Sequence, residues 1–539
     1  MLNSVKKTNF WMRYGHIIAS IVEILKTLIL VIKYCFLSKR AAFLRCLKSS
    51  IDYHSAQLTF IHLIPAAVFR LNDMKSNIIV TKVIKNILII FFSALCFCAN
   101  AFPDELKKPE ELEWRSPIPR FKALGINPDY LYSLAKEKIA LLVYPTKNII
   151  IDNAGNKKTF NNARLVSSIT VIDAPVKEVK ELIKDYASYS DLMPRTEKAT
   201  IVQKSGKHSL VEYLLVFKMP VLAVKIKYIF QYTEENNGDI SIRLHEGGGE
   251  EGASRWEFIP LSNGQTLLVF TTWNNLENSR YFFKTIVKVQ PVLKTTIPEI
   301  SAILAIDAIK KYFEKENRSA KITDEKKQFI PALKLQNKPY NMKLPQVPVF
   351  NIEERSAISM LSEFGVVLVL HPKKNFRKNN NEVIKLEYIS LIKKDSTSVK
   401  LNQDLVLNFS NYTEFIPQLD QLHHKKTDTG FQTNWHLKYK FGFFTLPVNI
   451  SLDYIWIEKN NLYFFLAEGD IKDFYGVYNW YSMDNQNNDT FLQYTLAVNL
   501  GSKLPLRLKV LNKMPRQSLL SGLFFVTNFV ESLNQKMEK

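Results

Sequence analysis

The strongest pattern in the chain is an alternation of apolar and polar positions between residues 197 and 275. In one stretch, Tyr228 and Tyr232 fall on one face of an extended chain, whereas Lys225 and Lys227 fall on the other. A period of two residues predicts a strand with one buried and one solvated face. Turn residues separate six such segments. They span residues 197–204, 208–220, 221–235, 238–246, 252–261 and 265–275.

Other elements flank these strands in a definite order. A strand over residues 164–173 precedes a short helix over 176–186, which begins after Asp173 as N-cap and Pro175 in the first turn. A long apolar helix is expected over 281–316. The order predicts an α+β domain in which a curved antiparallel sheet wraps around its C-terminal helix. Because such a sheet is wider than one helix can fill, a cavity for an apolar ligand is expected between them.

The chain carries this pattern twice. "SYSDLMP" at 188–194 recurs as "NYTEFIP" at 411–417. Segments on both sides recur in the same order, which indicates a duplicated domain and not a short-period solenoid. The matched pairs are 134–145 with 361–372, 167–186 with 388–409, 244–258 with 466–482, and 297–315 with 514–533.

We therefore expect two tandem domains. The first spans residues 128–317 and the second, more divergent one spans 352–539. Between them, residues 318–351 are rich in proline and lysine and are interpreted as a linker.

Three motifs of the first copy resemble the START and birch-pollen-allergen-like superfamily (SRPBCC), in particular its polyketide-cyclase and coenzyme-Q-binding branch. They are "APVKEVKELIKDYASYSDLMPRTEKATIV", "VEYLLVFKMPVLAVKIKYIFQYT" and "EGGGEEGASRWEFIPL". The resemblance is weaker in the second copy, where Thr397-Ser398 replaces Ala174-Pro175. It implies tandem helix-grip domains, each of which could hold a lipid, quinone, sterol or polyketide-like molecule between sheet and terminal helix. A cyclase or hydrolase and a partner-binding protein with filled cavities remain alternatives, because the fold does not choose among them.

The amino-terminal region contains a secretory signal. Residues 74–101 combine three lysines, an apolar run over 87–97 and an A-x-A cleavage site at Ala99-Asn100-Ala101. We therefore expect a periplasmic or secreted protein, or a membrane-anchored one if the segment is not cleaved. Residues 1–73 are interpreted as an over-extended start or an amino-terminal anchor, and 102–127 as a leader segment.

Charge and composition exclude several classes of function. The net charge is +21, but 13 of the 72 basic residues and only three of the 51 acidic ones lie in residues 1–101. The basic bias of the remaining body is too diffuse to favour nucleic acid, although it is compatible with contact with a membrane surface. All four cysteines also lie in residues 1–101, and the histidines form no HExxH motif. We predict no metal, no other cofactor and no assigned catalytic residue.

The candidate ligand-binding residues of the first copy are aromatic and apolar positions on the buried faces of the strands and of the terminal helix. They are Tyr213, Phe217, Tyr228, Phe230, Tyr232, Trp256, Phe270, Ile300 and Leu304. Ordinary core packing is the alternative for each of them.

Polar candidates lie at strand ends. Glu246, with its counterpart Glu468, could orient a head group or act as an acid or base at the cavity mouth. Alternatively, it is a solvated strand end paired with Arg255. Arg195 follows "LMP" at the expected cavity mouth and corresponds to Gln418, so the two copies should differ in head-group preference.

The terminal helices are unusually apolar. "LLSGLFFVTNFV" contains no charged residue, and Asp307 is the only one between Ile300 and Ile309. Such helices must be covered on most sides. An interface between the two repeats or docking to a membrane would provide the cover.

Overall fold

The computed structural model describes most of the chain from Trp114 onward. The described residues are 114–153, 156–218, 223–247, 251–276, 284, 288, 293–320, 329–333, 343–416, 418–441, 444–482, 490–501, 522–523 and 525–527. By its contacts the chain divides into residues 1–106 and 107–539. Outside the described residues lie residues 1–73, the predicted signal segment at 74–101 and most of the predicted leader segment at 102–127.

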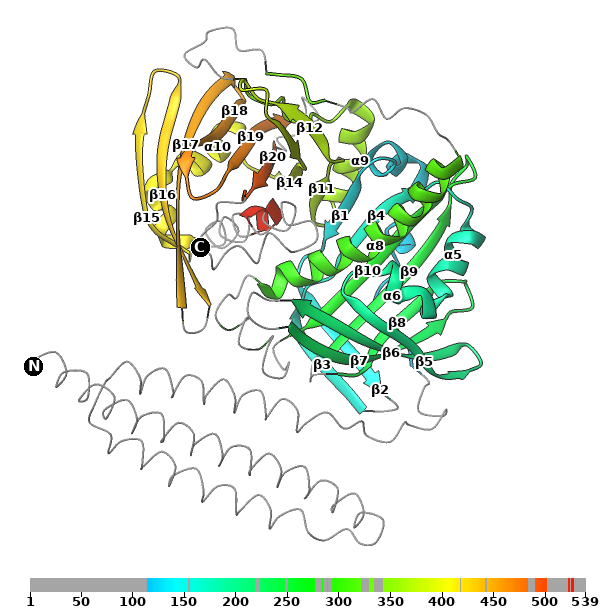
Figure 1. The fold of residues 1–539 in the computed structure, drawn as a ribbon. Coiled ribbons are helices and arrows are strands. Elements are labelled where there is room, and N and C mark those ends of the chain that lie inside the picture. The colour runs from blue at the N-terminus through cyan, green and yellow to red at the C-terminus, as the bar shows by residue number, and fades with distance from the viewer. Residues whose placement is uncertain are drawn as a thin grey trace, which may run out of the picture. The chain divides into compact units, whose positions relative to one another are not determined.

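A single antiparallel sheet of 16 strands contains strands from both copies (Figure 1). The first copy contributes β1 (Ile139–Val143), β4 (Val166–Ile172), β5 (Thr196–Ser205), β6 (His208–Lys218), β7 (Ala223–Glu234), β8 (Ile240–Glu246), β9 (Glu251–Pro260) and β10 (Thr266–Asn275). The second contributes β11 (Val366–Leu370), β14 (Ile389–Asp395), β15 (Leu419–Lys426), β16 (Gly430–Phe441), β17 (Phe444–Glu458), β18 (Asn461–Gly469), β19 (Asp473–Ser482) and β20 (Thr490–Asn499).

The order of the strands confirms the duplication. The sheet runs β15-β16-β17-β18-β19-β20-β14-β11-β1-β4-β10-β9-β8-β7-β6-β5, so one half repeats the other in reverse. The predicted α+β class is likewise confirmed. Each half has one strand more than predicted, because β1 and β11 are short, wholly apolar runs without the alternation that marks the other strands.

Short helices follow β4 and β14 at corresponding places. They are α5 (Val176–Lys184), η4 (Tyr186–Ser188) and α6 (Tyr189–Leu192) in the first copy, and α10 (Val399–Leu407), η5 (Phe409–Asn411) and α11 (Tyr412–Phe415) in the second. The predicted capping of α5 by Asp173 is wrong: Pro175 is the N-cap residue, and Asp173 accepts a hydrogen bond from Gln265. In α10, the Ser398 side chain accepts the Leu401 N–H at 3.3 Å, an ordinary N-cap.

The long helix α8 (Leu293–Ala320) lies across β1, β4 and β10 (Figure 1). Ile303, Ile306 and Ile309 on its inner side are fully buried. The corresponding helix of the second copy was predicted over 514–533, of which residues 522–523 and 525–527 are described; they are helical, and Leu523 and Val526 are buried. Among the helices the structure describes, none is both long and apolar enough to cross a membrane.

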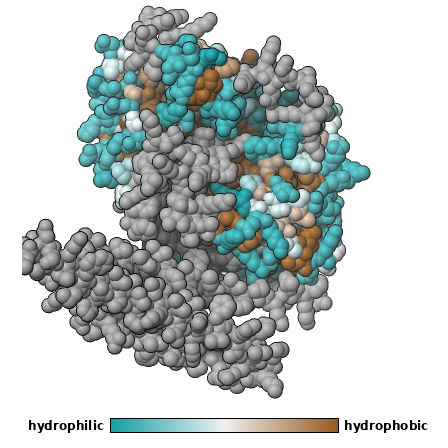
Figure 2. Space-filling model, viewed as in Figure 1, coloured by the Kyte–Doolittle hydropathy of each residue, from teal (hydrophilic) through white to brown (hydrophobic). Residues whose placement is uncertain are grey.

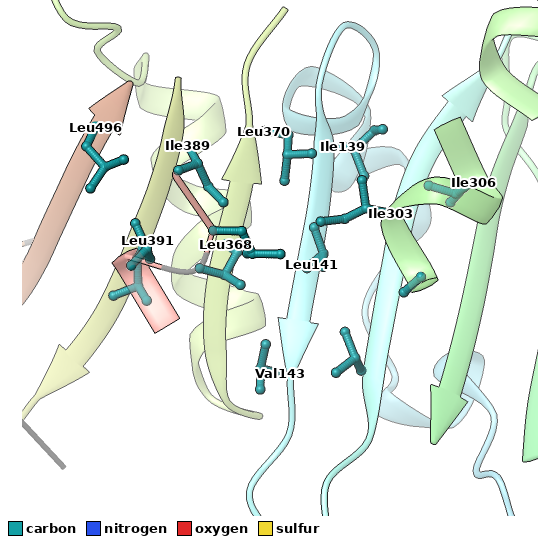
Figure 3. Close-up of a cluster of buried hydrophobic side chains, with 14 of the residues drawn as sticks. Ile139, Leu141, Val143, Ile303, Ile306, Leu368, Leu370, Ile389, Leu391 and Leu496 are labelled. Atoms are coloured by element: carbon teal, nitrogen blue, oxygen red, sulfur yellow. The ribbon is translucent and has the colours of Figure 1, made fainter. Parts of the chain in front are cut away.

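The two copies meet where β1 pairs antiparallel with β11. The register is symmetric about the Leu141–Leu368 pair, with Ile139 opposite Leu370 and Val143 opposite Val366. Figure 3 shows the apolar side chains that gather around this seam from both copies and from α8. The helices also meet, since the Thr527 hydroxyl donates to the Glu299 carboxylate at 2.8 Å. The described parts of the two repeats therefore share an interface.

The face of the sheet opposite α8 is covered by peripheral segments. In the first copy, the hairpin β2 (Lys147–Asn153) and β3 (Asn156–Ala163) packs with Trp114 and Ile118 against β9 and β10. In the second copy, the hairpin β12 (Lys374–Arg377) and β13 (Val383–Leu386) packs with part of the linker.

The described part of the linker is therefore integrated into the fold. Ile330, Leu344 and Val347 are buried in the same cluster as the β12–β13 hairpin, and Ala332 forms an isolated bridge with Pro345. The sequence did not predict the burial of these linker residues, because a proline-rich segment without hydrophobic periodicity carries no signal for burial.

Four further helical segments lie near the seam. They are the short segments η2 (Phe121–Leu124), η3 (Pro128–Leu131) and α4 (Tyr132–Ala135), and the longer helix α9 (Ile352–Ser362). Lys138 forms a largely buried ion pair with Glu354 of α9, which joins the two copies on this side.

A polar group recurs at the same point of each copy. Ser167 and Thr271 share a hydrogen bond of 2.7 Å, and the Tyr144 hydroxyl lies 3.0 Å from Ser167 Oγ. In the second copy, Ser390 and Thr495 are 2.7 Å apart, and His371 Nε2 lies 2.8 Å from Ser390 Oγ. His371 thus occupies the place of Tyr144. Burial away from water lowers the pKa of His371 to about 3.

The Leu368→Ala variant should lose about 2 to 5 kcal/mol of unfolding free energy, because it leaves a cavity at the centre of the seam. Urea unfolding of the full chain measures this. The Ile352→Ala variant is the control, since Ile352 is 81% exposed, and its effect should stay within about 0.5 kcal/mol. Equal losses in the two variants would contradict a closely packed seam.

Acid should destabilise the protein through His371. Because the folded pKa is about 3 and the unfolded value is 6.5, the unfolded state binds one more proton between these pH values. Stability therefore falls as pH decreases from 6.5 towards 3, by about 1.4 kcal/mol per pH unit. The His371→Tyr variant, which copies Tyr144, should remove this slope in unfolding curves measured across that range. An unchanged slope would show that other groups cause the acid sensitivity.

Candidate functional site

The concave face between the sheet of the first copy and α8 is rich in aromatic side chains. Strand alternation brings Tyr213, Tyr232, Trp256 and Phe270 to this face, where they belong to the same buried cluster as Ile303 of α8. The described outer surface in Figure 2 is largely hydrophilic, with smaller hydrophobic areas between the polar ones. The interior of this half is therefore the candidate ligand-binding site.

Two residues from the short helices complete the aromatic group. Tyr186 of η4 lies against Tyr232 with 4.2 Å between ring centroids, and Tyr189 of α6 lies 5.9 Å from Tyr213. Sequence reasoning did not single out either residue. Their spacing of three in "DYASY" is a weak signal for one face of a helical turn, and only the position of that turn over β6 and β7 shows what they contact.

The hydroxyl groups of this cluster have few partners. The Tyr213 and Tyr232 hydroxyls are 2.9 Å apart, and the Tyr189 hydroxyl donates to the Ile183 carbonyl at 2.7 Å. Burial raises the pKa values of Tyr186, Tyr189, Tyr213 and Tyr232 above the usual value for a phenol. All four therefore stay protonated and uncharged at physiological pH.

The remaining aromatic candidates extend this face. Tyr228 is buried, Phe230 is half-buried, and their ring centroids are 6.0 Å apart. The Tyr228 ring packs on Gly247, where a Cβ atom would come within 2.5 Å of it. Trp256 and Phe270 lie beside each other at 4.2 Å.

The structure describes the side chains of the two α8 candidates but only the backbone of Phe217. Ile300 and Leu304 are half-buried on α8, and Ile300 packs against the same cluster. The backbone of Phe217 belongs to β6, opposite Val224, but its side chain lies outside the described residues.

The two acidic candidates lie at strand ends, as expected. Glu246 ends β8 and is half-buried, whereas Glu468 near the end of β18 is exposed. The two residues correspond in sequence but differ in their surroundings.

Arg255 lies on the opposite face of the sheet from Trp256, its neighbour in β9, and so is separated from the aromatic group. Its guanidinium contacts Glu235 at 2.5 Å and the Ile118 carbonyl at 3.2 Å. The expected pair with Glu246 is replaced by this contact with Glu235. The next residue on this face, Glu257, accepts the backbone N–H groups of Phe121 and Lys122. Arg255 and Glu257 therefore attach residues 114–124 to the back of the sheet.

Arg195 lies immediately before β5 and has an unusual backbone conformation. Its φ of +71° lies in the left-handed region, which a non-glycine residue rarely adopts. The Val216 N–H donates to the Arg195 carbonyl at 2.8 Å, and Lys438 N–H donates to Gln418 in the same way at 2.7 Å. This hydrogen bond is thus shared by both copies, but the side chain of the accepting residue differs.

The second copy builds its concave face from a different set. At the positions of Tyr186, Tyr213, Tyr232 and Ile242 it carries Phe409, Trp435, Tyr454 and Phe464. The Phe464 ring lies on Gly476, where a Cβ atom would come within 2.1 Å of it. Its centroid is 5.4 to 5.8 Å from the rings of Tyr454, Phe474, Tyr478 and Tyr494. Aromatic side chains therefore fill the centre of this face.

Comparison with known proteins supports the resemblance that the motifs of the first copy suggested. Residues 172–290 match the family model described as polyketide cyclase / dehydrase and lipid transport. This match confirms the recognition of the superfamily, and the second copy is assigned from the repeated element order. No curated protein matches the chain.

Several solved structures are similar to parts of the chain. An aromatase/cyclase from Streptomyces sp. R1128 is 19% identical, with a TM-score of 0.25, over 29% of this chain and 98% of its own. A di-domain aromatase/cyclase from the steffimycin biosynthetic pathway is 8% identical, with a TM-score of 0.22, over 68% and 97%. Human StAR-related lipid transfer protein 5 is 12% identical, with a TM-score of 0.25, over 34% and 85%. At these TM-scores the similarities carry no argument about ligand or reaction.

The Arg255→Leu variant should release residues 114–124 from the sheet, because it removes a buried ion pair and a hydrogen bond to the Ile118 carbonyl. We expect a loss of about 3 kcal/mol of stability and faster amide hydrogen exchange in this segment. Lys225→Gln is the control, since Lys225 pairs with Glu197 in an exposed position and should cost less than about 1 kcal/mol. Unchanged exchange at residues 118–122 in Arg255→Leu would refute the attachment.

Proposed function

Residues 172–290 belong to the polyketide cyclase / dehydrase and lipid transport family, and from this premise we propose that the protein binds a hydrophobic small molecule in its first copy. The ligand would be a lipid, quinone, sterol or polyketide-like molecule. It would lie between the sheet and α8, as in a helix-grip arrangement. We further propose that the protein is exported, on the basis of the signal segment at residues 74–101.

The observation that carries the proposal is the aromatic face itself. Tyr213, Tyr228, Phe230, Tyr232 and Trp256 come from strands β6, β7 and β9 and line one side of the sheet under α8. Large aromatic rings offer much apolar area and fixed geometry, which suits binding of a flat or extended apolar molecule. Their phenols add hydrogen-bonding groups without charge.

The two copies support different roles. In the first copy, Ile242 stands where the second has Phe464, and Ser254 stands where it has Gly476. The Phe464 ring occupies the centre of the second copy's face and contacts four other rings. We therefore place the ligand in the first copy and give the second a supporting role: it pairs through β11 and covers one side of β1.

We propose binding and not catalysis. The tyrosine hydroxyls are held uncharged by burial, so they serve as hydrogen-bonding groups and not as bases at physiological pH. The arginine expected beside Glu246 is engaged on the other face of the sheet with Glu235. A carrier or sequestering protein fits this arrangement better than a cyclase or hydrolase.

Native mass spectrometry with solvent extraction should detect a co-purifying hydrophobic molecule in the exported protein. The Phe230→Gln variant should lose it, because a half-buried aromatic contact is replaced by a polar group. Leu452→Gln is the matched variant in the second copy, where Leu452 occupies the place of Phe230, and it should retain the ligand. Circular dichroism shows whether each variant is folded.

The opposite result would change the assignment. Loss of the molecule from Leu452→Gln with retention in folded Phe230→Gln would place the ligand in the second copy. A folded wild-type protein that stays empty against a broad lipid panel would overturn ligand binding and favour a partner-binding role.

A further inference from the structure

The hydrogen bond between the Tyr213 and Tyr232 hydroxyls leaves one of the two O–H donors without an acceptor within the pair. Each phenol carries one O–H donor and two acceptor lone pairs. At 2.9 Å, one hydroxyl donates to the other. Whichever of them donates, the second hydroxyl keeps a proton that needs an acceptor elsewhere.

The described part of the structure supplies no such acceptor. The Tyr189 hydroxyl donates to the Ile183 carbonyl and, among the described residues, forms no hydrogen bond with Tyr213 or Tyr232. Tyr213 and Tyr232 are 4% and 6% exposed, so bulk water does not replace the missing partner. A buried donor without an acceptor costs about 1 to 3 kcal/mol, and such donors are rare unless a bound molecule satisfies them.

Burial selects against an anion beside the phenols. Burial is the main cause that raises the pKa values of Tyr189 and Tyr186, to which Asp185 and Glu234 add smaller contributions. Lys180 and Lys184 both pair with Glu234, at 4.0 and 2.7 Å, so neither ion pair offers a free cation to such an anion. A carboxylate or phosphate beside the phenols would meet a buried, net unfavourable environment.

The pair is specific to the first copy. The corresponding positions of the second copy are Trp435 and Tyr454, with Thr433 in place of Val211. There the Trp435 Nε1–H donates to Thr433 Oγ1 at 2.7 Å, so an indole replaces the phenol of Tyr213, while Tyr454 keeps a phenol at the place of Tyr232. The two copies thus offer different polar chemistry at the same point of the fold.

We propose that the Tyr213–Tyr232 pair donates a hydrogen bond to an uncharged oxygen of the ligand, such as a ketone or quinone carbonyl. The inference rests on the proposed ligand binding and narrows its class. The ligand is an apolar molecule with an uncharged oxygen acceptor at the end that lies beside η4 and α6. Free fatty acids and phospholipid head groups are excluded from this end.

Binding of 9-fluorenone and fluorene to the full chain tests the proposal, because the two probes share a shape and differ in the carbonyl. The wild-type protein should bind fluorenone more tightly than fluorene. In the double variant Tyr213→Phe/Tyr232→Phe, the ratio of the fluorene Kd to the fluorenone Kd should fall by about 3- to 10-fold, while the fluorene Kd itself stays unchanged. Tyr454→Phe is the control, since Tyr454 holds the place of Tyr232 in the second copy, and this variant should keep the preference. Fluorene-9-carboxylate should bind worst.

A second measurement does not depend on a folded variant. The infrared carbonyl stretch of bound fluorenone should shift to lower frequency than in an apolar solvent, because it accepts a hydrogen bond. An unshifted band, or an unchanged preference in the folded double variant, would overturn the inference and leave ligand binding intact. Tight binding of fluorene-9-carboxylate would overturn the inference that the ligand presents an uncharged oxygen. If the wild-type protein binds none of the probes and extracts no lipid, the proposed function fails and the inference fails with it.

Discussion

The pairing of β1 with β11 is the interaction on which the architecture of residues 114–527 depends. Each of these strands is short and wholly apolar, so neither could stand at the edge of a sheet in water without exposing both its backbone and its side chains. Antiparallel pairing about Leu141 and Leu368 provides hydrogen-bond partners for the backbone of both strands and buries their side chains. It also joins two sheets of eight strands into one of 16. The same pairing brings α8 against the second copy's helix, where Thr527 donates to Glu299.

A second constraint is the two-residue period of the strands. It sends Trp256 to the concave face and Arg255 to the other, and each face then acquires a separate role. The concave face gathers the aromatic group under α8. The opposite face is closed by residues 114–124, by the hairpins β2–β3 and β12–β13, and by part of the linker. A functional interior and a structural exterior are thus built from the same strands.

Duplication preserved the scaffold and changed the interior. The serine–threonine contact between neighbouring strands is kept in both halves, and so is the backbone hydrogen bond to the carbonyl of Arg195 or Gln418. By contrast, Tyr213 and Tyr186 of the first copy correspond to Trp435 and Phe409 in the second. In addition, Phe464, packed on Gly476, fills the centre of the second face. Because backbone pairing fixes the sheet and side chains fill it, one copy could specialise in holding a ligand while the other stabilises the seam.

The sequence by itself determined the α+β class, the duplication, the alternating strands and the aromatic character of the buried face, since these follow from periodicity and from repeated motifs. It also placed Tyr213, Tyr232, Trp256 and Phe270 on one face, because alternation along a strand is a local property. Three features came only from the tertiary structure: β1 and β11 as central strands, Tyr186 and Tyr189 as members of the aromatic group, and Glu235 as the partner of Arg255. Each depends on contacts between segments far apart in the chain, which a local pattern of residues does not encode.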